Sequence, residues 1–237
     1  MPLALTGSLA VAGLLAGWPQ RAVITRLAVP DARIWPEALV PGGVTAILLG
    51  ALAARVPSGP FLDGPFLDGT PARALVLAAA CWLAVCAVPL IFTDLAVSRL
   101  PDPLTAAAYA GTAALLLLAA ATGSAATSSA TAGQAASWSA LLRAGLGGLA
   151  LAGFYLLLMI ISPSGMSLGD VKLAASLGTL LAWFGWRALI AGGAAGFLLG
   201  GLGGVVLLAS RRADRKQMIP FGPFMIAGAF LAVLTFR

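Results

Sequence analysis

Residues 72–93 read ARALVLAAACWLAVCAVPLIFT, an apolar run in which Arg73 is the one charged side chain. A helix needs about 20 predominantly apolar residues to cross the hydrocarbon core of a bilayer. The run meets this length, and Asp94 follows it directly. We therefore predict that residues 72–93 form a membrane-spanning helix.

Seven further apolar runs come near or reach the same length, at residues 3–18, 38–54, 104–121, 139–161, 171–186, 188–209 and 221–236. The composition agrees with them. Of 237 residues 60% are apolar and 9% are charged, whereas a soluble domain carries roughly 25% charged residues. The expected fold class is all-α, a polytopic transmembrane bundle of about eight helices.

Composition also marks a linker and limits the chemistry of the chain. Residues 122–137, which are rich in Ser, Thr, Ala and Gly, are expected to form a flexible linker. Histidine is absent, and the two cysteines, Cys81 and Cys86, are too few for a four-cysteine zinc site. We therefore expect no metal and no cofactor, and any catalysis has to use other side chains.

The basic residues predict topology and give no support for nucleic-acid binding. The net charge is +6, but the lysines and arginines lie between apolar runs and not on one face. The densest cluster, within residues 211–216, follows the run 188–209 and is expected to be cytoplasmic. Alternation of the runs then puts both termini outside and the segments around residues 94–101 and 164–170 at the cytoplasmic face.

Two carboxylates stand apart from the other acids, most of which lie in polar or breaker-rich loops (Asp31, Glu37, Asp63, Asp68 and Asp214). Asp94 directly follows the run 72–93, and a carboxylate at the edge of hydrocarbon is a functional candidate. Alternatively, the helix ends at Asp94 and its charge reaches the water at the lipid headgroups. Asp170 begins the run 171–186, where Ser167 and Asp170 also fit a helix capping box. Position alone leaves both interpretations open.

Considered together, Asp94 and Asp170 suggest a chemistry. The predicted topology brings both to one membrane face although 76 residues separate them. Two carboxylates that approach closely cannot both stay ionised, and one keeps a proton. Such a pair is the catalytic unit of aspartic proteases and requires neither histidine nor metal. Asp102, between two prolines, is a rival for the first position that we interpret as a loop charge.

At these residues the sequence resembles the type IV prepilin peptidases, which are membrane aspartyl proteases. Their first catalytic aspartate precedes a basic stretch and a proline, as in DLAVSRLP at 94–101. Their second lies in a Gly-x-Gly-Asp motif followed by a hydrophobic residue and lysine, as in GDVKLA at 169–174. A late Pro-Phe-Gly-Pro segment matches IPFGPF at 219–224. The resemblance spans most of residues 74–236, with Ser167 in place of the first motif glycine.

The resemblance implies an endopeptidase that cleaves the short basic leader from prepilin or pseudopilin precursors at the cytoplasmic side of a bacterial inner membrane. It implies Asp94 and Asp170 as the catalytic pair. Residues that would bind substrate or shape the site are Gly169, Lys172, Ser167 and Pro220. The resemblance implies that residues 74–237 form the catalytic membrane domain, preceded by N-terminal membrane helices and loops in residues 1–73. Because residues 1–73 contain no cysteine, it also implies a peptidase-only form without the N-terminal methyltransferase domain.

Three other functions remain open from sequence. Gly-rich helices with isolated acids also suit a small proton-coupled transporter, although the two halves show no inverted repeat and the acids are predicted at a helix edge. A presenilin-type protease would place its first aspartate deep in a helix beside tyrosine, where Thr93 precedes Asp94 here. A catalytically impaired peptidase homologue is the third alternative, raised by Ser167.

Overall fold

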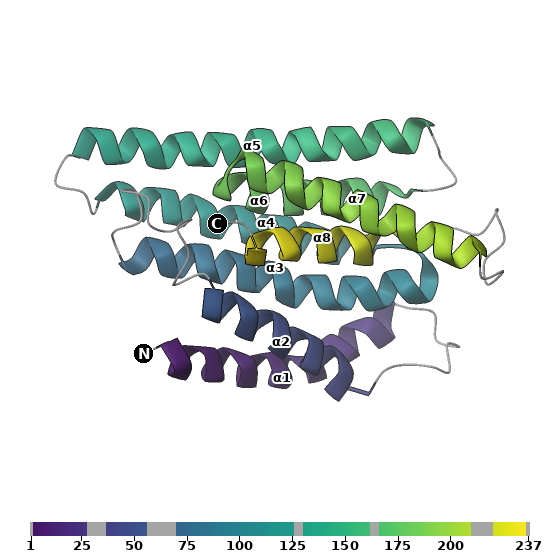
Figure 1. Ribbon diagram of the computed structural model, residues 1–237. Coiled ribbons are helices and arrows are strands. Elements are labelled where there is room, and N and C mark those ends of the chain that lie inside the picture. Colours follow the sequence, from purple (N-terminus) through teal and green to yellow (C-terminus); the bar gives the residue numbers. More distant parts are fainter. Residues whose placement is uncertain are drawn as a thin grey trace.

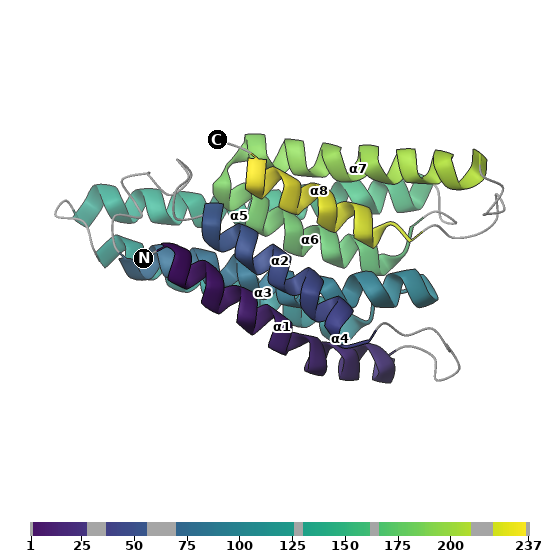
Figure 2. The same ribbon diagram turned by 60° about the horizontal axis from the view of Figure 1, so that its bottom comes forward.

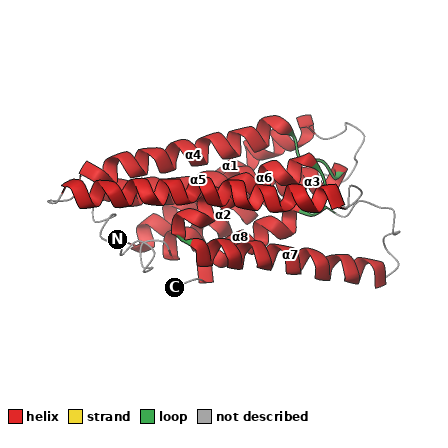
Figure 3. Cartoon of the chain, turned by 90° about the horizontal axis from the view of Figure 1, so that it is seen from above, coloured by secondary structure: helices red, strands yellow, loops and turns green. Residues whose placement is uncertain are grey.

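The computed structural model describes residues 2–27, 37–55, 70–125, 130–161, 166–209 and 220–235. These residues form eight helices and no strand (Figures 1 and 3). The helices are α1 (Pro2–Leu27), α2 (Leu39–Arg55), α3 (Thr70–Val97), α4 (Asp102–Ala125), α5 (Ala130–Ile161), α6 (Leu168–Phe184), α7 (Trp186–Ala209) and α8 (Gly222–Thr235). The predicted all-α class with about eight helices is confirmed.

Four of the described helices are long and apolar enough to cross a bilayer: Pro71–Val97, Asp102–Gly123, Trp138–Ile161 and Trp186–Val205. Two shorter apolar helices cover Leu39–Ala54 and Gly222–Thr235. Large apolar side chains are exposed along the outside, among them Ile47 and Leu149 at 72% each. Such a surface is stable only against lipid, so the chain is a membrane protein.

Helix α3 is the central element of the bundle. It packs against α1, α2, α4, α6 and α8, whereas α5 contacts α4, α6 and α7. Within the spanning segment, 61% of α3 is buried, against 22% for α5. Figures 1 and 2 show α1 and α2 along one side of the bundle, with α3 next to them. A residue on α3 can therefore meet side chains from most of the fold.

Glycines allow neighbouring helices to approach closely, as their abundance in the sequence predicts. A Cβ atom on Gly228 of α8 would collide with the backbone of Gly196 in α7. A Cβ atom on Gly178 of α6 would lie 2.8 Å from the carbonyl oxygen of Gly147 in α5. These contacts fix α8 and α6 to their neighbours through backbone, which leaves little freedom at the helix starts described below.

Pro89 interrupts the hydrogen bonding of α3 one turn before Asp94. Proline has no N–H group, so the carbonyl of Val85 loses its intrahelical donor. Gln20 of α1 supplies a replacement: its Nε2 donates to the Val85 oxygen at 3.0 Å, and its Oε1 accepts from Thr45 Oγ1 at 3.0 Å. Gln20 is 4% exposed. In lipid, this side chain satisfies a backbone group that water cannot reach.

The same interaction explains one wrong boundary. The run 3–18 was expected to end before Pro19-Gln20-Arg21, yet α1 continues through Pro19 to Leu27. Because Gln20 has partners on α2 and α3, its polarity does not end the helix. The linker predicted at 122–137 is also wrong in part, since α4 extends to Ala125 and α5 begins at Ala130. The basic cluster within 211–216 lies outside the described residues.

Arg143 of α5 holds the C-terminal end of α6. Its Nε donates to the carbonyl oxygen of Ala182 and its Nη2 to that of Trp183, both at 2.8 Å. The last carbonyls of a helix have no intrahelical donor, and a cation there also interacts favourably with the helix dipole. Gly185, with φ of 130°, then turns the chain into α7.

We expect Gln20→Leu to destabilise the fold by about 1 kcal/mol, because it leaves the buried Val85 carbonyl without a donor. Adding Pro89→Ala restores an N–H group that can bond to Val85 within α3, so the double variant should lose less stability than the sum of the two single variants. Unfolding in mixed micelles titrated with a denaturing detergent measures this. Strictly additive effects would show that Gln20 does not compensate for Pro89.

Candidate functional site

Asp94 and Asp170 are both buried, at 3% and 5% exposure. Asp94 lies in the last turn of α3, which continues to Val97, so the helix does not end at Asp94. The chain leaves α3 at Ser98, whose φ of 49° is left-handed and whose N–H donates to the Asp94 carbonyl oxygen at 2.7 Å. A left-handed residue is a common helix terminator. The helix therefore ends within one turn after Asp94.

The start of α8 supplies a hydrogen bond to Asp94. The Gly222 N–H donates to Asp94 Oδ2 at 3.0 Å, in a buried contact between residues 128 positions apart. Gly222 is the first residue of α8, and the first N–H groups of a helix have no intrahelical acceptor. A Cβ atom at Gly222 would lie 2.9 Å from the same carboxylate oxygen. Glycine therefore allows the carboxylate to approach the amide.

The start of α6 holds Asp170 in a similar way. Asp170 lies in the first turn of α6, and its Oδ2 accepts the Ser167 N–H at 2.8 Å and the Ser167 hydroxyl at 3.0 Å. The bond of the predicted capping box in which the capping residue's N–H donates to the Asp170 carboxylate is thus present. Ser167, which stands where the resembled motif has glycine, contributes a donor to this carboxylate. Asp170 Oδ1 is buried and has no hydrogen-bond partner among the described residues.

The two carboxylates share one electrostatic environment. Asp170 acts on Asp94 through a Coulombic interaction, although α3 and α6 are distant in sequence. The Tyr155 hydroxyl on α5 also interacts electrostatically with Asp170. The Tyr155 ring lies 5.9 Å from that of Phe221, which directly precedes Gly222. The pair is thus surrounded by α3, α5, α6 and the entry to α8.

The other residues selected from the sequence lie around this pair with different contacts. Gly169 packs closely against Leu100, because a Cβ atom added to Gly169 would lie 2.7 Å from the Leu100 Cβ. This contact packs the α3–α4 turn against the start of α6. Pro220 lies two residues before Gly222 and is partly buried. Neither residue donates a hydrogen bond to a carboxylate in the described contacts.

Lys172 pairs with an exposed carboxylate at the start of α4. Its Nζ pairs with Asp102 Oδ1 at 2.6 Å, and the two side chains are 49% and 73% exposed. Asp102 begins α4 and is not a loop charge, because it is the first residue of that helix. The pair therefore joins the starts of α4 and α6 on the outside of the site. Among the described residues, no group of three or more His, Cys, Asp or Glu side chains could hold a metal ion.

Sequence reasoning did not select Gly222 or Tyr155. Gly222 belongs to the Pro-Phe-Gly-Pro segment, whose two prolines indicated a helix entry but not which amide would point toward Asp94. Tyr155 is one of only two tyrosines in the chain and lies in an apolar run. A polar aromatic in such a run was a signal that could have been followed.

Comparison with known proteins identifies relatives. The chain is 38% identical over 81 residues to the prepilin leader peptidase/N-methyltransferase of Pseudomonas aeruginosa, which covers 34% of this chain and 27% of that protein. The protein of the same name from Pseudomonas putida is 37% identical over 81 residues, covering 34% of this chain and 27% of its own length. Part of this chain is therefore similar to the prepilin leader peptidases.

A third prepilin peptidase relative, from Stutzerimonas stutzeri, is 36% identical over 96 residues, which are 40% of this chain and 32% of the relative. The chain thus spans about a third or less of the length of the curated prepilin peptidases that it matches. No family model matches the chain, and no solved structure matches it.

We expect the exposed Lys172–Asp102 pair to contribute less than about 1 kcal/mol to stability, because solvent and salt screen surface ion pairs. Asp102→Asn and Lys172→Met should each shift the unfolding transition only slightly, and the shift should shrink further in high salt. Unfolding in mixed micelles at two salt concentrations measures both effects. A loss of several kcal/mol in either variant would contradict a surface role.

Proposed function

We propose that this chain is a membrane aspartyl endopeptidase that removes the short leader from type IV prepilin or pseudopilin precursors at the cytoplasmic face of a bacterial inner membrane. The observation that carries the proposal is the pairing of two buried carboxylates, Asp94 and Asp170, from segments 76 residues apart. The names of the relatives, which include prepilin leader peptidases, support the substrate class.

The chemistry follows from two carboxyl groups that share one proton. The ionised member accepts a proton from a water molecule as the water oxygen attacks the scissile carbonyl carbon. The protonated member donates its proton to the carbonyl oxygen, which gives a neutral tetrahedral intermediate. When this intermediate collapses, the carboxyl group that took the proton from water gives it to the leaving nitrogen and the C–N bond breaks. A hydroxyl proton of the intermediate passes to the other carboxylate as the carbonyl group of the product forms. No cofactor enters these steps.

The hydrogen bonds at the site suggest how the carboxyl groups are oriented. Asp94 Oδ2 and Asp170 Oδ2 each accept bonds from the protein, through Gly222 and Ser167 respectively. Asp170 Oδ1 remains without a partner among the described residues. It is the oxygen that can carry the shared proton or contact water and substrate. Ser167 fixes Asp170 and is compatible with an active enzyme.

Asp94→Asn and Asp170→Asn should each reduce cleavage of a co-expressed prepilin at least about a hundredfold, since each removes one half of a proton-transfer pair. The mobility shift of the cleaved pilin on a gel measures the reaction, and membrane extraction with an unchanged unfolding transition shows that the variants fold. Asp102→Asn is the matched control and should keep most activity. If both buried-site variants cleave normally, the chain is not an aspartyl peptidase of this design.

Gly222→Ala should lower kcat by about 10- to 100-fold with little change in KM, because the new Cβ displaces the Asp94 carboxylate and small misplacements of catalytic groups are costly. Gly145→Ala is the matched control, since a Cβ there has no atom within 4 Å. Steady-state kinetics on a purified prepilin in detergent separates kcat from KM. If Gly222→Ala leaves kcat unchanged while Asp94→Asn is inactive, the Gly222 contact does not position the Asp94 carboxylate for catalysis.

A further inference from the structure

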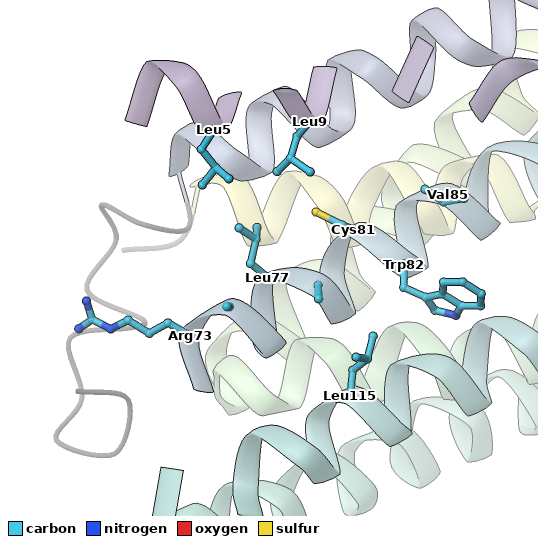
Figure 4. Close-up of a pocket in the computed structure, with 10 residues that line it drawn as sticks. Leu5, Leu9, Arg73, Leu77, Cys81, Trp82, Val85 and Leu115 are labelled. Carbon is cyan, nitrogen blue, oxygen red and sulfur yellow. The ribbon is translucent and has the colours of Figure 1, made fainter. Parts of the chain in front are cut away.

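A groove on the outside of the bundle lies away from the two carboxylates. Its floor is one face of α3, its walls are Leu5 and Leu9 of α1 and Leu115 of α4, and its volume is about 660 Å³ (Figure 4). This volume is in the range of small-molecule sites. Arg73 is the one charged residue that lines it. The groove is therefore apolar along its length and basic at one end.

The groove is not part of the catalytic arrangement. Asp94 meets α8 and α6, whereas the groove opens between α1 and α4. Cys81, in the middle of the groove floor, precedes Asp94 by 13 residues, which at 3.6 residues per turn puts the two about 140° apart around α3. A substrate helix lying in this groove would be on the wrong side of α3 for its leader to reach the aspartates.

The position of Arg73 suggests a headgroup. Arg73 precedes Asp94 by 21 residues, and a rise of 1.5 Å per residue separates them by about 32 Å, close to the thickness of the hydrocarbon core. If Asp94 lies at one membrane surface, Arg73 lies at the other. In Figure 4 the Arg73 side chain points beyond the end of the groove, away from Leu77 and Leu9.

We propose that this groove binds a phospholipid with an anionic headgroup, one acyl chain along α3 and the phosphate at Arg73. The guanidinium has five donors and matches phosphate geometry, so it can bind a phosphate in addition to protein contacts. A protein helix is a poor occupant, because close helix packing in membranes uses small residues, whereas both walls here present leucines. The small Ala78 on the floor leaves room for a chain of methylene groups.

The test compares lipid retained by the full chain. The protein is reconstituted with equal amounts of phosphatidylglycerol and phosphatidylcholine, extracted in mild detergent and analysed by native mass spectrometry. The parent should retain phosphatidylglycerol preferentially. Arg73→Ala should reduce this retention about fivefold, in line with the free energy of one basic residue near an anionic lipid, and leave phosphatidylcholine unchanged. Ala78→Phe fills the groove and should reduce retention of both lipids.

Arg187→Ala is the matched control. Arg187 is an exposed arginine at the start of α7, at the end of the bundle away from the carboxylates and outside the groove. Its variant should retain lipid like the parent. Equal retention of the two lipids by the parent, or parent-like retention by Arg73→Ala or Ala78→Phe, overturns the proposal. The proposal is also overturned if native mass spectrometry shows a second copy of the chain bound in place of the lipid. An unchanged unfolding transition shows that each variant is folded.

Discussion

The constraint on which this site depends is that a carboxylate buried in a membrane protein needs hydrogen-bond donors that do not come from water. Burying an ionised group without partners is strongly unfavourable. This chain has no histidine, and Lys172, the cation nearest in sequence to Asp170, is bound to Asp102 outside the site. The donors instead come from helix starts, the Gly222 amide of α8 and the Ser167 amide and hydroxyl before α6.

Amides at helix starts can donate to the buried carboxylates only if the helices are held in place. The packing of the bundle holds them. Helix α6 is fixed at its far end by Arg143 and along its length by the close contact of Gly178 with α5. Helix α8 is fixed by Gly228 against α7. On α3, the side chain of Gln20 compensates for Pro89, so Asp94 remains on a continuous helix after the proline. The positions of the two amides thus depend on contacts far from the carboxylates.

Length and apolarity were enough to predict most of the bundle. The runs 72–93, 104–121, 139–161 and 188–209 all lie within observed helices, because lipid requires every backbone group to bond within its own segment. The proximity of Asp94 and Asp170 was also predictable, since alternating helix directions bring their segments to one end of the bundle. The continuation of α1 through Pro19 was not, because it depends on partners of Gln20 in two other helices. Gly222 was missed for the same reason: no local pattern reveals which amide meets a distant carboxylate.

The two faces of α3 illustrate why the site is at a helix end. Its groove side is apolar from Ala74 to Val85, and its other side packs against α6 and α8. A peptide backbone brings its own polar groups, which an apolar groove within lipid cannot satisfy. The exit of α3 at Ser98 and the starts of α6 and α8 bring backbone donors and two carboxylates together. Under the proposed function, a leader peptide that stays in the aqueous phase reaches Asp94 and Asp170 there, while the apolar part of its helix remains in the bilayer.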